Sequence, residues 1–182
     1  MNHDDHVALI ETGIGRGSGG VWADFGAGSG AFTLALRDIA GPEVEIIAVD
    51  RDRRSLDELR QAMARQFPGA RLETLAADFT TLLDLPPLDG IVAANAIHFV
   101  RDRQTLLQRW RAYLQPHGRL VIVEYAAERG NRWVPFPVPF AAFQRLAPAA
   151  GFTAPALIAT RPSWFMQGMY GAVAIREPDS CE

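Results

Sequence analysis

The chain contains no lysine, since all 18 of its basic residues are arginines. Schiff-base enzymes, pyridoxal phosphate enzymes and P-loop nucleotide-binding enzymes each need a lysine amine in the site. The missing residue type therefore excludes these three classes before any motif is considered.

Cysteine is almost as scarce, because Cys181, next to the C-terminus, is the only one in the sequence. A single cysteine forms neither an internal disulfide nor a cysteine-based metal cluster, and we expect no thiolate catalysis from it. His3 and His6, beside Asp4 and Asp5, are residue types that bind metals, but no further cluster of such residues supports them. We therefore expect a flexible polar terminus and no metal site.

The sequence also has no apolar run long enough to span a bilayer, and its net charge is only -3. Residues 1–6 are polar and partly acidic, and they lack the basic start and apolar stretch of a secretory signal. We expect a cytoplasmic protein without a membrane partner. The acidic balance gives no overall attraction to polyanions, so nucleic acid is not an expected partner.

The composition that is present is typical of a globular protein, with 48% hydrophobic and 21% charged residues. A chain of 182 residues is long enough for one compact core and short for two full domains. We predict a single domain with an N-terminal extension or short helix at 1–20, a core at 21–176 and a tail at 177–182.

Apolar segments and chain breakers alternate between strand and helix patterns along the sequence. The predicted strands are Val21–Phe25, Val44–Val49, Leu72–Ala76, Ile91–Ala94, Leu120–Val123, Ala156–Thr160 and Tyr170–Ile175. The predicted helices are Ala31–Ala40, a segment with Leu56, Leu59, Met63 and Phe67 at helical spacing, a segment from Asp102 to Leu114 ended by Pro116 and Gly118, and Phe140–Leu146. This alternation predicts an α/β fold with a doubly wound, mostly parallel sheet, helices on both faces and an antiparallel edge formed by the last two strands.

The strongest motif is Asp24-Phe25-Gly26-Ala27-Gly28-Ser29-Gly30, which joins the first predicted strand to the first predicted helix. Its glycines allow a ligand to approach the backbone, and the helix start offers free N–H groups. Asp50 ends the second strand, where a carboxylate can accept hydrogen bonds from ribose hydroxyls. The loop has G-x-G-x-G spacing after an acidic residue rather than the dinucleotide pattern G-x-G-x-x-G, which favours S-adenosylmethionine (SAM) over NAD.

At these residues the sequence resembles the class I SAM-dependent methyltransferases, whose first motif is matched by Asp24, Gly26, Gly28 and Gly30. The resemblance extends from about Val21 to Ile175. It implies a Rossmann-like, seven-stranded sheet with an antiparallel last strand, SAM as cofactor and S-adenosylhomocysteine as product.

The same resemblance implies a role for each matching position around SAM. The loop, including Ala27, would hold the methionine portion, Asp50 the ribose and Asp78 the adenine amine, with Arg51 and Phe79 flanking the adenine. Asn95 lies in the segment 94–98, which matches the stretch beside the transferable methyl group. An exposed arginine beside an aspartate is, however, equally typical of a surface ion pair.

Candidate catalytic residues follow the fourth and fifth strands. His98 is a candidate general base for an acceptor that loses a proton, although a histidine packed against the next helix is an equal alternative. Glu124 and Tyr125 end the fifth strand at the same edge, where Glu124 can also bind loop amides. Trp133, in a proline-spaced aromatic segment with Phe136 and Phe140, is a candidate part of a substrate lid or of ordinary edge packing.

The leading hypothesis is transfer of a methyl group from SAM to oxygen, nitrogen or carbon of a small molecule. An NAD-dependent oxidoreductase, a non-catalytic SAM-binding module and an RNA methyltransferase using Arg101, Arg103, Arg109 and Arg111 stay open. DNA adenine methylation is disfavoured because the Asn/Asp-Pro-Pro-Tyr/Phe motif is missing, and arsenic methylation because it needs several cysteines. The acceptor and the oligomeric state are not specified by these patterns.

Overall fold

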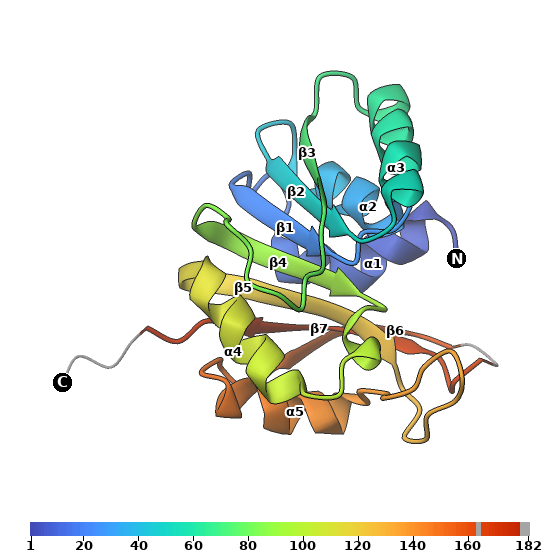
Figure 1. Cartoon of the computed structure of the whole chain (residues 1–182), viewed down its shortest axis with the longest axis vertical. Helices are drawn as coiled ribbons and strands as arrows, with labels where there is room; N and C mark the ends of the chain where they lie inside the picture. Colours follow the sequence, from blue (N-terminus) through green and yellow to red (C-terminus); the bar gives the residue numbers. More distant parts are fainter. Residues whose placement is uncertain (163–164, 179–182) are drawn as a thin grey trace.

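The computed structural model describes residues 1–162 and 165–178, so Cys181 lies outside the described part of the chain. A seven-stranded sheet with the order β3-β2-β1-β4-β5-β7-β6 runs through the molecule (Figure 1). The strands are β1 Val21–Phe25, β2 Glu45–Asp50, β3 Arg71–Ala76, β4 Leu88–Ala94, β5 Leu114–Tyr125, β6 Ala156–Arg161 and β7 Met169–Ile175. Strands β1 to β5 pair in parallel, and β7 is antiparallel to both β5 and β6. The predicted fold class is therefore confirmed.

Helices cover both faces of the sheet, as Figure 1 shows. They are α1 His3–Ile14, α2 Ala31–Ala40, α3 Arg53–Gln66, the short 3-10 helix η1 Ile97–Phe99, α4 Arg103–Tyr113 and α5 Phe140–Ala149. One apolar cluster joins α1, α2 and α3 to the sheet, and the other joins α4 and α5 to the opposite face. Along β5, Leu120 and Ile122 belong to one cluster while Val121 and Val123 belong to the other. This burial on both sides explains why the central strands are continuously apolar.

Helix α1 corrects the prediction of a flexible polar terminus. Asn2 caps the helix by accepting a hydrogen bond from the Asp5 amide, and the Asp5 side chain accepts one from the Asn2 amide. His3 pairs with Asp38 at 3.1 Å, and His6 packs on Phe32 with the ring centroids 4.8 Å apart. Polar residues in this segment therefore serve as helix caps and interhelix contacts, and no group of metal-binding side chains occurs in the described residues.

The boundary between α4 and β5 also differs from the prediction. The helix ends at Tyr113, and Leu114 already pairs with Leu88 of β4, before a shift in strand register. Pro116 lies in the displaced segment, where His117 takes a φ of 64°. A proline is tolerated in such a bulge because no ladder hydrogen bond is required of it there. Other element boundaries move by a few residues only.

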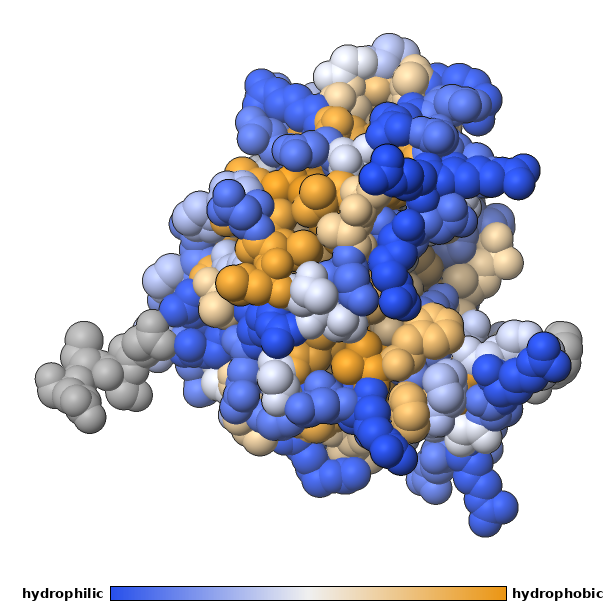
Figure 2. All heavy atoms as spheres, in the orientation of Figure 1, coloured by the Kyte–Doolittle hydropathy of each residue, from blue (hydrophilic) through white to orange (hydrophobic). Residues whose placement is uncertain are grey.

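The connection between β3 and β4 contains no helix in the described structure, where the prolines at 86 and 87 disfavour one. It is held instead by α4, because the Tyr113 hydroxyl accepts a hydrogen bond from the Leu83 amide at 2.8 Å and the Trp110 indole donates to the Phe79 carbonyl at 3.3 Å. Figure 2 shows apolar residues exposed over this part of the sheet. No described helix combines the length and the apolar character that a membrane span requires.

Gly171 provides a test of how closely α1 packs on the sheet. A Cβ at this position of β7 would collide with the main-chain carbonyl of Leu9, which cannot rotate away. We expect Gly171→Ala to reduce the free energy of unfolding by about 1–3 kcal/mol. Urea denaturation measures this change, with Glu58→Ala as control, because Glu58 is an exposed residue of α3 and its change to alanine introduces neither a clash nor left-handed strain. Equal losses in both variants would contradict the close packing.

Candidate functional site

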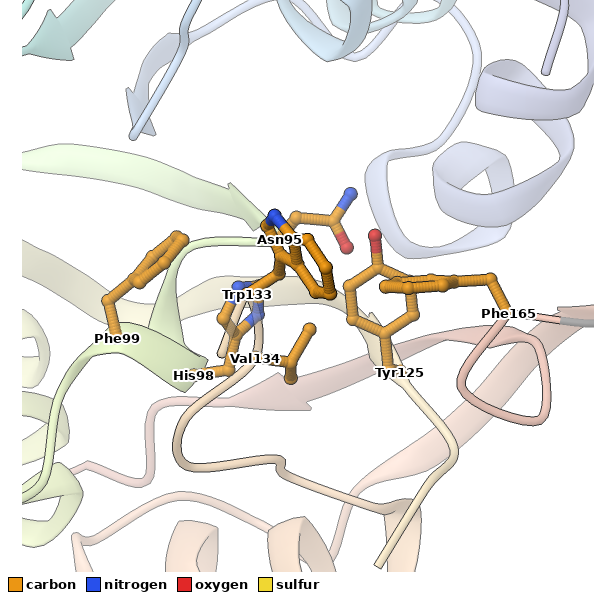
Figure 3. Close-up of a pocket in the computed structure, with 7 residues that line it drawn as sticks. All are labelled: Asn95, His98, Phe99, Tyr125, Trp133, Val134 and Phe165. Atoms are coloured by element: carbon orange, nitrogen blue, oxygen red, sulfur yellow. The ribbon is translucent and has the colours of Figure 1, made fainter. Parts of the chain in front are cut away.

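Two adjoining cavities lie where the parallel strands β1, β2, β4 and β5 end. The glycine-loop cavity has a volume of about 170 Å³ and is lined by Gly26, Asp50, Arg51, Phe79, Asn95, Ala96 and Phe99. The aromatic cavity has a volume of about 650 Å³ and is lined by Asn95, His98, Phe99, Tyr125, Trp133, Val134 and Phe165 (Figure 3). Asn95 and Phe99 belong to both walls, so the two cavities meet at these side chains.

The three glycines of the motif are required for different physical reasons. A Cβ on Gly26 would lie 2.8 Å from the Ala96 Cβ, and one on Gly30 would collide with Leu59, so the fold itself requires both. A Cβ on Gly28 would meet no described atom within 4 Å, although its φ of 52° is left-handed. The open space beside Gly28 is therefore available to a ligand.

Asp50 is oriented by the backbone around it. The Gly28 amide donates to Asp50 Oδ2 at 2.8 Å, and the Asp52 amide donates to Oδ1 at 2.9 Å. Each carboxylate oxygen keeps a second lone pair for another donor. Since Asp50 also lines the glycine-loop cavity, its position agrees with the predicted contact to ribose hydroxyls.

Asp78 is bound to its own loop rather than lining either cavity. Its Oδ1 accepts hydrogen bonds from the Thr80 hydroxyl at 2.6 Å and the Thr80 amide at 2.8 Å, and Arg51 lies 3.4 Å from Oδ2. These contacts, the Thr80 hydroxyl first, lower the pKa of Asp78. Arg51 and Phe79 do line the glycine-loop cavity, while the Arg51–Asp78 ion pair matches the surface-pair alternative.

Asp24 lies beneath the glycine loop and lines neither cavity. Its side chain is 1% exposed and accepts a hydrogen bond from the Thr33 hydroxyl of α2 at 2.6 Å. Burial raises the pKa of Asp24 to about 7. Ala27 is buried in the α1–α2–α3 cluster, and its amide donates to the Val49 carbonyl at 3.1 Å. These two residues therefore fasten the loop to α2 and β2.

His98 and Glu124 form a buried pair between the ends of β4 and β5. Glu124 is fully buried, and its Oε2 lies 2.8 Å from His98 Nδ1. The Glu124 carboxylate also accepts hydrogen bonds from the amides of Ile97, His98 and Tyr125. The position of Glu124 places the ring proton of His98 on Nδ1 and leaves the Nε2 lone pair free. His98 lines the aromatic cavity, and its Nε2 has no hydrogen-bond partner among the described residues.

The loop after β5 closes the aromatic cavity. Asn131 Oδ1 accepts hydrogen bonds from the amides of Trp133 and Val134, both at 2.8 Å. Its Nδ2 contacts Met166 Sδ at 3.0 Å, so the loop is linked to the chain segment that carries Phe165. Of the three aromatic residues considered for a lid, only Trp133 lines this cavity.

The other two aromatic residues of that segment have different positions. Phe140 packs edge-on against Tyr170 with the ring centroids 5.6 Å apart, and the Arg101 guanidinium lies over the Phe136 ring. The Phe136 amide donates to the His98 carbonyl at 3.0 Å. Phe136 and Phe140 therefore serve edge packing, which was the alternative considered from the sequence.

Asn95 is the most unusual residue at the junction of the cavities. Its φ of 53° is left-handed, a conformation that asparagine tolerates better than most residues. Its side-chain Oδ1 is buried and has no hydrogen-bond partner in the described structure. A buried carbonyl oxygen without a partner is costly, so this atom is a natural acceptor for a donor on a bound ligand.

Comparison with known proteins identifies the family. The family model described as "Methyltransferase domain" matches residues 23–118, more than half of the chain. The chain belongs to this methyltransferase domain family. The class I methyltransferase resemblance seen in the sequence is thereby confirmed, and the family supports SAM as the cofactor.

Individual relatives of this methyltransferase domain are distant. A probable cobalt-precorrin-6B C(15)-methyltransferase (decarboxylating) of Thermoplasma volcanium is 27% identical over 65% of this chain and 58% of the relative. The ubiquinone/menaquinone biosynthesis C-methyltransferase UbiE of Syntrophotalea carbinolica is 31% identical over 57% of this chain and 43% of the relative. The chain thus spans about half the length of these curated relatives.

A similar solved structure is the 1,6-didemethyltoxoflavin-N1-methyltransferase of Burkholderia thailandensis with bound 1,6-didemethyltoxoflavin and S-adenosylhomocysteine. Its TM-score is 0.73 at 21% identity, covering 97% of this chain and 78% of that chain. At this identity the likeness supports the shared fold and leaves the substrate open.

The methyltransferase fold brings most of the predicted site residues together and adds several others. Phe99, Val134 and Phe165 line the aromatic cavity, and Ala96 lines the glycine-loop cavity, although none was a candidate from the sequence. Phe99 directly follows His98 at the end of η1. Its position next to a candidate catalytic residue could therefore have indicated that it lies in the site. Phe165 offered no local signal, because it reaches the site through the return of the chain before β7.

Gly28 allows a direct test of the space seen beside the loop. We expect Gly28→Leu to weaken SAM binding by more than about a hundredfold, about 2.8 kcal/mol, because the side chain fills that space. Gly28→Ala has the same left-handed strain with a much smaller side chain and is the matched control. Calorimetric titration with SAM measures the difference, and equal affinities of the two variants would contradict the assignment.

Asp24 predicts a pH dependence of stability. Its pKa of about 7 lies above the ordinary value of 3.8, so between these values the folded state holds a proton that the unfolded state has lost. Stability from this group therefore falls as pH rises, by at most about 1.4 kcal/mol per pH unit. Asp24→Asn keeps an acceptor for Thr33 but cannot titrate, so its free energy of unfolding should fall less between about pH 5 and pH 7. Urea denaturation across this range checks the slope, and parallel curves would contradict it.

Proposed function

We propose that this protein transfers a methyl group from SAM to a small-molecule acceptor. The observation that carries this proposal is the junction of the two cavities at Asn95 and Phe99. A cofactor in the glycine-loop cavity and an acceptor in the aromatic cavity would meet at these side chains. Methyl transfer needs such a meeting point, because the acceptor must attack the methyl carbon directly in line with the leaving sulfur.

The residues present fit SAM on two observations. Gly28 faces open space beside Asp50, and the buried Asn95 Oδ1 lacks a partner in the described chain. We assign Asp50 to the ribose, Arg51 and Phe79 to the adenine, and the backbone beside Gly26 and Gly28 to the methionine portion. When bound, SAM supplies an activated methyl on a sulfonium, so the protein's remaining task is to orient the acceptor.

His98 has the geometry of a general base for an acceptor that loses a proton. Glu124 fixes the ring and accepts from Nδ1, which leaves Nε2 as the proton acceptor on the cavity side. Glu124 acts through His98 and is a positioning residue. A module that only binds SAM has no need for this buried pair beside a second cavity, so the pair favours an enzyme.

Three of the four arginines that an RNA methyltransferase would use bind carbonyl groups of the fold itself. Arg103 donates to the carbonyls of Phe136 and Pro137, Arg109 to Thr80, and Arg111 to Gly151 and Glu177. These guanidinium groups are used to hold loops of the fold. We therefore propose a small molecule rather than a nucleic acid as partner, and a cytoplasmic location stays a prediction of the sequence.

Titration calorimetry with SAM, S-adenosylhomocysteine and NAD tests the cofactor assignment. We expect micromolar affinity for the first two and no binding of NAD. Asp50→Ala should weaken SAM binding by about 1–3 kcal/mol, because charged hydrogen bonds are lost. Glu58→Ala is the control, since Glu58 is an exposed acid on α3. Binding of NAD alone would assign the protein to the oxidoreductases instead.

A further inference from the structure

We propose that the acceptor is a planar, uncharged aromatic molecule carrying a hydroxyl group, and that this hydroxyl is the methylated group. The inference rests on the proposed function and specifies its acceptor. It is drawn from the walls of the aromatic cavity, from their lack of fixed charge, and from the position of three polar groups.

The walls of the cavity are mainly flat rings. Tyr125 and Phe165 meet edge to face at 5.3 Å, and His98 lies 4.3 Å from the Phe99 ring and 5.7 Å from the Tyr125 ring. Figure 3 shows Trp133 and Tyr125 between Phe99 and Phe165. Rings from separate segments favour a flat aromatic ligand over a bulky aliphatic one, because ring stacking adds to the burial of apolar area. The volume of about 650 Å³ lies within the range of sites that hold small organic ligands.

Two considerations limit the charge of the ligand: the absence of charged side chains from the described lining, and the positive charge of SAM. None of the described residues lining the cavity is arginine, aspartate or glutamate, so the protein walls give an anion no charged partner to offset its desolvation. A cation would approach the positive sulfonium of SAM at the shared wall and be repelled. The Arg132 guanidinium lies over the Trp133 ring at 5.8 Å and so occupies part of its aromatic surface. An uncharged acceptor is therefore favoured.

Three polar groups show where a hydroxyl would lie. Figure 3 shows the Asn95 amide and the Tyr125 hydroxyl facing the same space, and the ring centroids of His98 and Tyr125 are 5.7 Å apart. Burial, and then the nearby Glu124 charge, raise the pKa of Tyr125, which keeps its hydroxyl protonated and able to donate. An acceptor hydroxyl here can accept from Tyr125 and direct its own proton to His98 Nε2.

The groups present account for every bond and proton in the transfer. The acceptor oxygen forms a bond to the methyl carbon while the carbon–sulfur bond of SAM breaks, giving neutral S-adenosylhomocysteine. The hydroxyl proton passes to His98 Nε2, so the ring becomes an imidazolium beside Glu124, and it later loses the proton to water. The net products are a methyl ether, S-adenosylhomocysteine and one proton.

Binding of three matched probes tests the acceptor class. Calorimetry in saturating S-adenosylhomocysteine would compare 2-naphthol with decahydro-2-naphthol, which is not planar, and with 2-naphthoate, which is charged. We expect 2-naphthol to bind about tenfold more tightly than either analogue. Equal or tighter binding of an analogue would overturn the class. Failure of S-adenosylhomocysteine itself to bind would instead overturn the proposed function.

Variants of the loop after β5 locate the binding site of the probe. Trp133→Leu should weaken 2-naphthol binding about fivefold or more while affinity for S-adenosylhomocysteine stays unchanged. Phe136→Leu is the matched control, because Phe136 is an aromatic residue of the same segment that does not line the cavity. Equal effects of the two variants would overturn the site.

Turnover tests the methylated group. Mass spectrometry of 2-naphthol incubated with SAM should detect 2-methoxynaphthalene. His98→Gln should reduce kcat by about a hundredfold or more with little change in KM. Tight binding of 2-naphthol without methylation by the wild-type protein would overturn the assignment of the hydroxyl, and an unchanged kcat in His98→Gln would overturn the role of His98.

Discussion

The carboxylate of Glu124 is the contact on which the site depends. It lies at the end of β5 and receives three backbone amides and the His98 ring, so it holds η1 and the start of the aromatic cavity in place. A fully buried carboxylate is tolerated only where its lone pairs are satisfied. The four donors meet this requirement, and the same geometry fixes which nitrogen of His98 is free. One interaction therefore sets both local structure and chemistry.

The glycine loop between β1 and α2 likewise serves both the local structure and the candidate site. Gly26 and Gly30 are demanded by close packing, whereas Gly28 leaves space for a ligand and orients Asp50 through its amide. Asp24 extends this support into the interior, where it joins β1 to Thr33 of α2. The parallel sheet gathers these loops at one edge because its strands all end there. The site is thus a product of sheet topology as much as of motif residues.

The features that could be predicted from the sequence are those that depend on residues close together in the chain. β1 and α2 were predicted with correct bounds, because glycines punctuate both ends, and Asp50, Asn95 and His98 were found because they follow strand ends. Motif position could not show that Asp24 faces the interior, since that depends on Thr33. The start of β5 was missed because the pairing of its first residue with β4 is a tertiary contact. Phe165 was missed for the same reason.

The wall shared by Asn95 and Phe99 has a thermodynamic consequence. Two ligands that contact the same side chains can change each other's affinity, and any such change is reciprocal. The Asn95 Oδ1 is buried at this wall without a hydrogen-bond partner in the described chain, so a donor on either ligand changes the polar environment that the other ligand meets. The affinities of the two cavities are therefore linked through the side chains of Asn95 and Phe99.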